Sequence, residues 1–215
     1  MSTATETRVR VELPTPHSYQ AKFIDSPSKR IIIRAGRRSG KTVGIAIRAV
    51  CRFLEGKRQL YGAPTVEQID RFWFEVTRAL APLIELGVLK KNETEHFIEK
   101  PGTRQRIKAK TVWNAETLRG DDADDLYLDE CQLMNEDTFE VVGVPMLLDS
   151  NGNAVLVYTP PSLRSAGVSK AHDPRWAAKM FKMAVADKTG RWQAIHFTSH
   201  DNPYISHEAL GELIQ

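Results

Sequence analysis

Residues 30–50 read RIIIRAGRRSGKTVGIAIRAV, and this stretch decides the fold. It starts with an apolar run typical of a buried strand, passes through a basic loop that contains glycine, and continues with helical periodicity. A loop placed in this way between a strand and a helix binds phosphates, because its backbone N–H groups and the positive end of the helix face the anion. The stretch predicts an α/β fold with a site for a nucleoside triphosphate.

The loop residues differ in their expected roles. We expect Lys41 to pair with phosphate oxygens, Thr42 to ligate Mg²⁺ through its hydroxyl, and Gly40 to let the backbone come close. Ala35 stands where such a loop usually has its first glycine, and Gly36 follows it directly. The alternative is a Gly-rich turn that only caps a helix. The other loop residues expected at the nucleotide are Gly36, Arg37, Arg38 and Ser39, with Arg37 also counted as catalytic.

A second motif, DDLYLDE at residues 124–130, ends a short apolar run with two carboxylates. Ligands of parallel sheets bind at the carboxyl ends of the strands, so we expect Asp129 to hold Mg²⁺ directly or through water. Glu130 can orient and polarise a water for attack on the γ-phosphate, which a kinase does not need. The pair favours hydrolysis, whereas the alternative is an ordinary strand end with solvated acids. Solvated acids are what we expect of the upstream aspartates Asp121, Asp122, Asp124 and Asp125.

The rest of the chain alternates short apolar runs with longer helical stretches, which predicts a mostly parallel central sheet flanked by helices. Strands are expected at 30–34, 59–63, 126–129, 154–158 and 193–198. Helices are expected at 41–55, 66–86, 136–148, 176–186 and from Ser206, and Pro82 is a point where one of them could break. Residues 96–100 and 106–113 alternate around the turn PGTR and predict an antiparallel hairpin.

Composition bounds the class of protein. The 215 residues, 41% hydrophobic and 27% charged, fit one globular domain. The net charge is only +3, so any contact with nucleic acid must be local. Cys51 and Cys131 lack metal-binding spacing, which indicates a reduced, cytoplasmic protein. No apolar run approaches the roughly 20 residues that span a bilayer, so no membrane contact is expected.

Residues 35–42, AGRRSGKT, match the phosphate loop typical of the large terminase subunits of tailed bacteriophages, and the chain resembles this family over nearly its whole length. The resemblance implies a P-loop NTPase of the ASCE/RecA-like type that takes ATP and Mg²⁺. It also implies that hydrolysis powers the translocation of double-stranded viral DNA into a procapsid.

The resemblance extends to three further segments. In PHSYQAKF it implies that Gln20 reads the adenine edge through paired hydrogen bonds. In ETLRGDDADDLYLDE it implies that Arg119 is an arginine finger supplied to a neighbouring subunit. In YTPPS it implies that Thr159 senses the γ-phosphate and passes hydrolysis on to DNA movement, although a Thr-Pro-Pro after a strand is also an ordinary turn.

The family also implies the organisation and the partners. We expect an arm at 1–15, the ATPase domain at 16–200 and, at 201–215, the start of a linker toward a nuclease domain absent from this chain, so no cutting activity. The expected assembly is a homo-oligomer, usually a pentameric ring, on the procapsid portal in the host cytoplasm, with the small terminase subunit as a partner and no place in the virion. Basic residues around the hairpin could touch the DNA backbone without reading sequence: Lys90, Lys91, Lys100, Arg104, Arg106, Lys108 and Lys110. The alternative is a solvated hairpin face, which is the commoner explanation of alternating Lys and Arg on a strand.

Two other functions stay open from the sequence. A helicase-like ATPase stimulated by nucleic acid would share Lys41, Asp129 and Glu130 and would differ in unwinding a duplex. A nucleotide-binding assembly module would use ATP as a switch without turnover, although Glu130 speaks against it.

Overall fold

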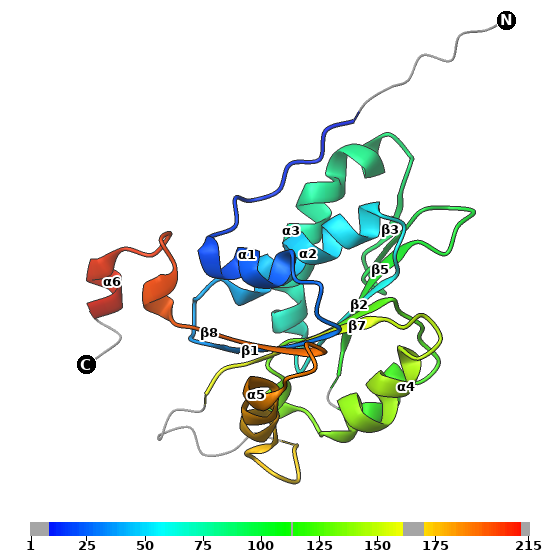
Figure 1. The fold of residues 1–215 in the computed structure, drawn as a ribbon. Helices are drawn as coiled ribbons and strands as arrows, with labels where there is room; N and C mark the ends of the chain where they lie inside the picture. Colours follow the sequence, from blue (N-terminus) through cyan, green and yellow to red (C-terminus); the bar gives the residue numbers. More distant parts are fainter. Residues whose placement is uncertain (1–8, 113, 161–169, 212–215) are drawn as a thin grey trace, which may run out of the picture.

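The predicted strands come together in one sheet of eight strands in the computed structural model, which describes residues 9–112, 114–160 and 170–211 (Figure 1). The order across the sheet is β3-β4-β5-β2-β6-β7-β1-β8. The strands are β1 (Arg30–Ala35), β2 (Gln59–Ala63), β3 (Lys90–Asn92), β4 (Phe97–Glu99), β5 (Arg106–Thr111), β6 (Asp125–Leu128), β7 (Asn153–Tyr158) and β8 (Trp192–Phe197).

The five strands predicted as buried are parallel neighbours, from β2 through β6, β7 and β1 to β8. The predicted hairpin is confirmed as β4 and β5, which pair antiparallel, while β5 also pairs parallel to β2. The polar edge strand β3 was not predicted. The hairpin was expected to run on to Trp113, which lies outside the described residues.

Helices cover both faces of the sheet, as Figure 1 shows. Ile31 and Ile33 pack into the core under one layer, and Ile32 packs into the core on the opposite face. One layer holds α1 (Ser18–Ile24), α2 (Lys41–Leu54) and α3 (Val66–Glu85), and the other holds α4 (Val144–Met146) and α5 (Trp176–Ala186), with α6 (His207–Gly211) beyond β8. Among the helices that the structure describes, none combines the length and the apolar character that crossing a membrane requires.

The short helix α1 is held on α2 by a buried arginine. Arg48 donates from Nη1 to the carbonyl oxygens of Phe23 at 2.6 Å and Ile24 at 2.8 Å, which satisfies the open end of α1. Before α1, residues 9–15 form no regular element, yet Val11 and Leu13 pack against the core. This part of the expected arm therefore lies on the domain, and residues 1–8 are outside the described part.

The prediction of one α-helix at 136–148 is wrong. The chain forms a π-helical turn at Thr138–Gly143 and a single α-helical turn, α4. Pro145 has no N–H to donate to the carbonyl oxygen of Val141, so this α-helical hydrogen bond is missing, and the turn before it is π-helical. By contrast, α3 continues through Pro82 to Glu85 without the break that the sequence allowed.

Two of the upstream aspartates, Asp124 and Asp125, are not solvated as expected. Asp125 is 1% exposed and accepts bonds from Arg52 at 3.2 Å and Asn153 at 2.7 Å. Asp124 forms an ion pair with Arg58 at 3.0 Å. These acids come just before and at the start of β6, beside Arg52 of α2 and Arg58, which directly precedes β2. They are therefore internal partners rather than surface charge.

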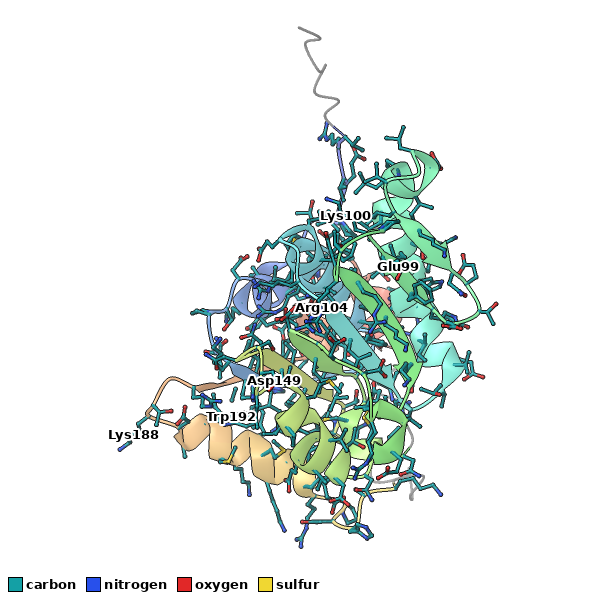
Figure 2. All side chains as sticks on the ribbon, turned by 90° about the vertical axis from the view of Figure 1, so that its right-hand side faces the viewer. Glu99, Lys100, Arg104, Asp149, Lys188 and Trp192 are labelled. Atoms are coloured by element: carbon teal, nitrogen blue, oxygen red, sulfur yellow. The ribbon has the colours of Figure 1, made fainter. Side chains whose placement is uncertain are left out.

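The basic hairpin face is partly neutralised in the same way. Lys108 and Lys110 both reach Asp121, at 2.9 and 2.6 Å, and Arg104 reaches Asp122 at 2.5 Å. Figure 2 looks onto the ends at which the parallel strands begin, and it labels Arg104 together with Glu99 and Lys100. Arg106 also pairs with Asp122, at 3.5 Å, and Lys91 pairs with Glu93, so five of the seven basic residues considered for DNA contact have acidic partners within the chain.

Candidate functional site

The phosphate loop spans residues 36–40 between the end of β1 and the start of α2. Its backbone is left-handed at Arg38, with φ 57°, and at Gly40, with φ 87°. A Cβ at position 40 would also lie 2.8 Å from the Nε2 atom of Gln20. Gly40 is therefore required both by conformation and by space, as the motif implies.

The sheet brings the two predicted motifs together. Lys41 forms an ion pair with Glu130, Nζ to Oε1 at 2.6 Å, and the Thr42 hydroxyl donates to Oδ2 of Asp129 at 2.7 Å. Only β7 separates β1 from β6, and all three strands are parallel, so the residues after β1 and β6 meet at the same carboxyl edge.

Asp129 is deeply buried. It is 3% exposed, and the Tyr61 hydroxyl donates to the same Oδ2 atom at 3.0 Å. Burial raises the pKa of Asp129 above its ordinary value, and the charge of Glu130 adds to this against the opposing charge of Lys41. The Thr42 hydroxyl and the Asp129 carboxylate form a pair of hard oxygen ligands, a donor set that fits Mg²⁺ when phosphate oxygens and water complete the shell.

Glu130 is held by donors on three sides. Besides Lys41, the Thr159 hydroxyl donates to Oε1 at 3.0 Å and Gln132 Nε2 donates to Oε2 at 2.7 Å. Burial alone would raise the pKa of Glu130, but Lys41 and these hydrogen bonds outweigh it and hold the pKa below its ordinary value. Glu130 is therefore an ionised carboxylate with a fixed orientation.

Gln132 was missed by the sequence analysis. Its amide also accepts from the backbone N–H of Thr159 at 3.3 Å, so it bridges Glu130 to the end of β7. The only signal in the sequence was a polar side chain two residues beyond Glu130, and nothing there indicated that Thr159 lies beside it.

The other residues of the phosphate loop differ in exposure and in hydrogen bonding. Arg37 and Arg38 are exposed, and their side chains form no hydrogen bond or ion pair with a residue that the structure describes. Ser39 is fully buried, and its N–H donates to the carbonyl oxygen of Gly36 at 3.4 Å. The N–H of Gly36 donates to the carbonyl oxygen of Phe197 at 3.1 Å. That N–H is thus engaged by β8, contrary to the expectation that it faces a phosphate.

Gln20 lies beside a cavity next to the loop. Its Oε1 atom accepts from the N–H of His17 at 2.9 Å, and its Nε2 atom donates to the carbonyl oxygen of Gly40 at 2.7 Å. Both ends of the amide are thus engaged by backbone, and adenine reading by Gln20 stays a prediction. The cavity, about 390 Å³, is lined by Pro14, Thr15, Gln20, Gly40, Val43, Arg71, Asn202 and Tyr204.

Arg119 lies apart from these residues. Its side chain is 60% exposed and pairs with Glu116 at 2.6 Å. In the described part of the chain, no contact joins it to Lys41 or Glu130, so its role as a finger for a neighbouring subunit stays a prediction.

The sequence matches the model of a known protein family. The family model described as terminase large subunit, T4likevirus-type, N-terminal, matches residues 32–210. A search of curated proteins gives no match.

Solved structures of phage terminases share the fold. A mutant ATPase domain of the Thermus phage P74-26 large terminase has a TM-score of 0.70 at 19% identity, over 87% of this chain and 83% of that chain. The large terminase of the thermophilic bacteriophage D6E, also solved with ATP-γ-S and with ADP, has a TM-score of 0.67 at 16% identity, over 93% of this chain and 50% of that one. The HK97 large terminase has a TM-score of 0.67 at 13% identity, over 93% and 46%. This chain spans about half of the D6E and HK97 proteins. Because the family model covers most of its length, the chain belongs to the family of phage terminase large subunits, whose N-terminal region it carries.

Proposed function

We propose that this chain binds ATP with Mg²⁺ and hydrolyses it to power the translocation of double-stranded DNA into a phage procapsid. The observation that carries the proposal is the ion pair of Lys41 and Glu130 at 2.6 Å, beside the hydrogen bond from Thr42 to Asp129. Membership of the terminase family and the complex of the D6E protein with ATP-γ-S support the same reading.

Binding of ATP changes the partner of Lys41. The ammonium group exchanges Glu130 for oxygens of the β- and γ-phosphates, and N–H groups of the loop bind the same anion. Arg37 and Arg38, exposed beside the loop, add positive charge. The cavity beside Gln20 takes the base.

Thr42 and Asp129 hold Mg²⁺ in this proposal. An ion held by these two residues would supply positive charge beside the phosphates. Its positive charge also favours the ionised form of Asp129, against the burial that raises the pKa of that carboxyl.

Glu130 directs the attacking water. Once Lys41 has turned to phosphate, Gln132 and Thr159 still hold the carboxylate in place. It accepts a hydrogen bond and then the proton from water, whose oxygen bonds to the γ-phosphorus as the bond to the bridging oxygen breaks. Thr159 forms hydrogen bonds with both Glu130 and Gln132. A shift of Glu130 on loss of the γ-phosphate would therefore reach the end of β7 through Thr159.

Assembly belongs to the same proposal. Arg119 of one subunit completes the site of its neighbour in a ring, which docks at the procapsid portal with the small terminase subunit as a partner. The ring moves DNA without reading its sequence, in the cytoplasm of the infected bacterium. Residues 16–200 are the proposed ATPase domain, and no cutting of DNA is assigned to them.

The isosteric change Glu130→Gln tests the reaction. We expect the variant to bind ATP-γ-S as the unchanged protein does, and phosphate release to fall on the order of 10²- to 10⁴-fold, because the water loses its base. Glu95→Gln, an exposed carboxylate outside the site, is the matched control and should leave turnover unchanged. An unchanged protein that binds ATP and never releases phosphate would instead be a nucleotide switch, and strand separation of a forked duplex would favour the helicase-like function.

A further inference from the structure

Four consecutive carbonyl oxygens of the phosphate loop accept hydrogen bonds from side chains outside the loop. Ser199 Oγ donates to the oxygen of Arg37 at 2.5 Å, and Asn202 Nδ2 donates to that of Arg38 at 2.8 Å. His17 Nε2 lies 3.1 Å from the oxygen of Ser39, and since a carbonyl only accepts, this nitrogen carries the proton. Gln20 Nε2 donates to the oxygen of Gly40 at 2.7 Å. We call the four donors, His17, Gln20, Ser199 and Asn202, the carbonyl clamp.

The clamp comes from two segments far apart in the chain. His17 and Gln20 lie at the start of α1, and Ser199 and Asn202 belong to the turn that follows β8. Figure 1 shows α1 and this turn at the same end of the sheet. The segments also contact each other, because the Tyr204 hydroxyl donates to the carbonyl oxygen of Thr15 at 2.9 Å.

Peptide geometry links the clamp to phosphate binding. The C=O of one residue and the N–H of the next lie in one plane and point in opposite directions. Donors that hold the carbonyl oxygens of Arg37, Ser39 and Gly40 on one side therefore direct the N–H groups of residues 38, 40 and 41 to the other side. The N–H of Ser39 instead donates to the carbonyl oxygen of Gly36 at 3.4 Å, inside the loop. Converging N–H groups in a loop with left-handed residues form an anion-binding concavity, and fixing them beforehand lowers the entropy cost of binding.

The loop glycines fit the same arrangement. A Cβ at Gly36 would lie 2.9 Å from the backbone nitrogen of Ser199. A Cβ at Gly40 would lie 2.8 Å from Gln20 Nε2 and 3.4 Å from His17 Nε2. The clamp thus occupies the space that a side chain at either glycine would need.

We propose that His17, Ser199 and Asn202 are positioning residues that hold the loop so that its N–H groups of residues 38, 40 and 41 face the phosphates of the nucleotide, without touching the nucleotide's phosphates themselves. The inference rests on the proposed nucleotide binding and adds residues to it that no sequence motif indicates. The opposing view is that these bonds only fasten the turn after β8 to the domain. In that case their loss would lower stability and leave phosphate affinity unchanged.

Calorimetric titration of the full chain with inorganic triphosphate separates these views, because this probe has phosphates and no base. We expect Ser199→Ala and Asn202→Ala each to weaken binding about five-fold and the double variant more than ten-fold, as each removes one hydrogen bond that orders the loop. Ser199→Thr keeps the hydroxyl and should restore affinity. His200→Ala, an exposed residue on the same turn, is the control.

Thermal unfolding of each variant is measured alongside. Weakened triphosphate binding at an unchanged midpoint, with rescue by Ser199→Thr, supports the clamp. Equal affinity in all variants, or a loss of affinity that follows a loss of stability, overturns the clamp and leaves the nucleotide site intact. Absence of triphosphate and ADP binding in the unchanged protein overturns the proposed function and the clamp with it.

Discussion

The two carboxylates of the site share one turn of chain and differ in their surroundings. Asp129 is buried with its pKa raised, whereas Lys41, Gln132 and Thr159 hold the pKa of Glu130 down. Glu130 is thus ready to accept a proton, and a bound cation would favour the ionised form of Asp129 against the burial that raises its pKa. This division supports the proposed roles, in which Glu130 activates the water and Asp129 binds the metal.

Gln132 acts on the reaction through Glu130. In Gln132→Met the carboxylate loses its Oε2 donor and its bridge to Thr159, while the side-chain volume is nearly kept. We expect kcat for ATP hydrolysis to fall on the order of ten-fold with little change in KM, since Gln132 makes no contact with the phosphate loop in the described structure. Steady-state kinetics measure both, and a rise in KM at constant kcat would contradict this role.

Tyr61 stabilises the buried Asp129. Tyr61→Phe removes the hydroxyl that donates to Asp129 and keeps the ring, which stacks on Phe72 at 3.9 Å between centroids. We expect the free energy of unfolding to fall by about 1.5–3 kcal/mol, the range for a hydrogen bond to a charged group. Urea unfolding near pH 7 measures the change, and equal midpoints for both proteins would show that Asp129 does not need this donor.

At the scale of elements, the sequence predicts the five parallel strands because each is a short apolar run bounded by turn residues. It does not predict β3, whose residues Lys90–Asn92 are all polar and form a strand only through β4. The same limit applies to α1, where seven residues are too few for a periodic signal. These elements exist through tertiary contacts, and a local pattern does not carry that information.

The residues of the site also fall into those that a local pattern predicts and those that tertiary contacts bring in. Lys41, Thr42, Asp129 and Glu130 lie in two compact motifs and were predicted to share one site. The contacts of Ser199 and Asn202 with the phosphate loop span more than 160 residues of chain, and those of Gln132 depend on the packing of β6 against β7. Such residues can be recognised as part of the site only from the folded structure.

The loop before β6 is fastened to β5 by charge, which makes its stability depend on pH. Burial raises the pKa of Asp121, but Lys108 and Lys110 outweigh it and hold the pKa below the ordinary value. The carboxylate therefore stabilises the fold above the ordinary carboxyl pKa, and this contribution is lost as pH falls through the lowered pKa.

Asp121→Asn tests this fastening. At pH 7 we expect a lower free energy of unfolding than in the unchanged protein, with the difference shrinking as pH falls below about 4. Denaturant unfolding across pH measures it, with the exposed Asp149→Asn as control. A difference that stays constant down to acid pH would mean that the charge of Asp121 is not the cause.

At the scale of the whole molecule, the proposed ring makes each active site a product of two subunits. Arg119→Ala and Glu130→Gln should each abolish turnover alone, because one lacks the finger and the other the base. Mixed in equal amounts, they should regain activity, since about a quarter of randomly formed interfaces would join an intact Arg119 to an intact Glu130. A mixture that stays inactive at ring-forming concentration would contradict a shared site.

The central claim is that this chain hydrolyses ATP at the site of Lys41 and Glu130. Steady-state phosphate release by the purified chain, measured over a wide range of protein concentration beside Lys41→Ala, tests it most directly. We expect turnover per subunit to rise with protein concentration and to be lost in the variant. ATP binding without phosphate release at every concentration, or release that persists in Lys41→Ala, would contradict it.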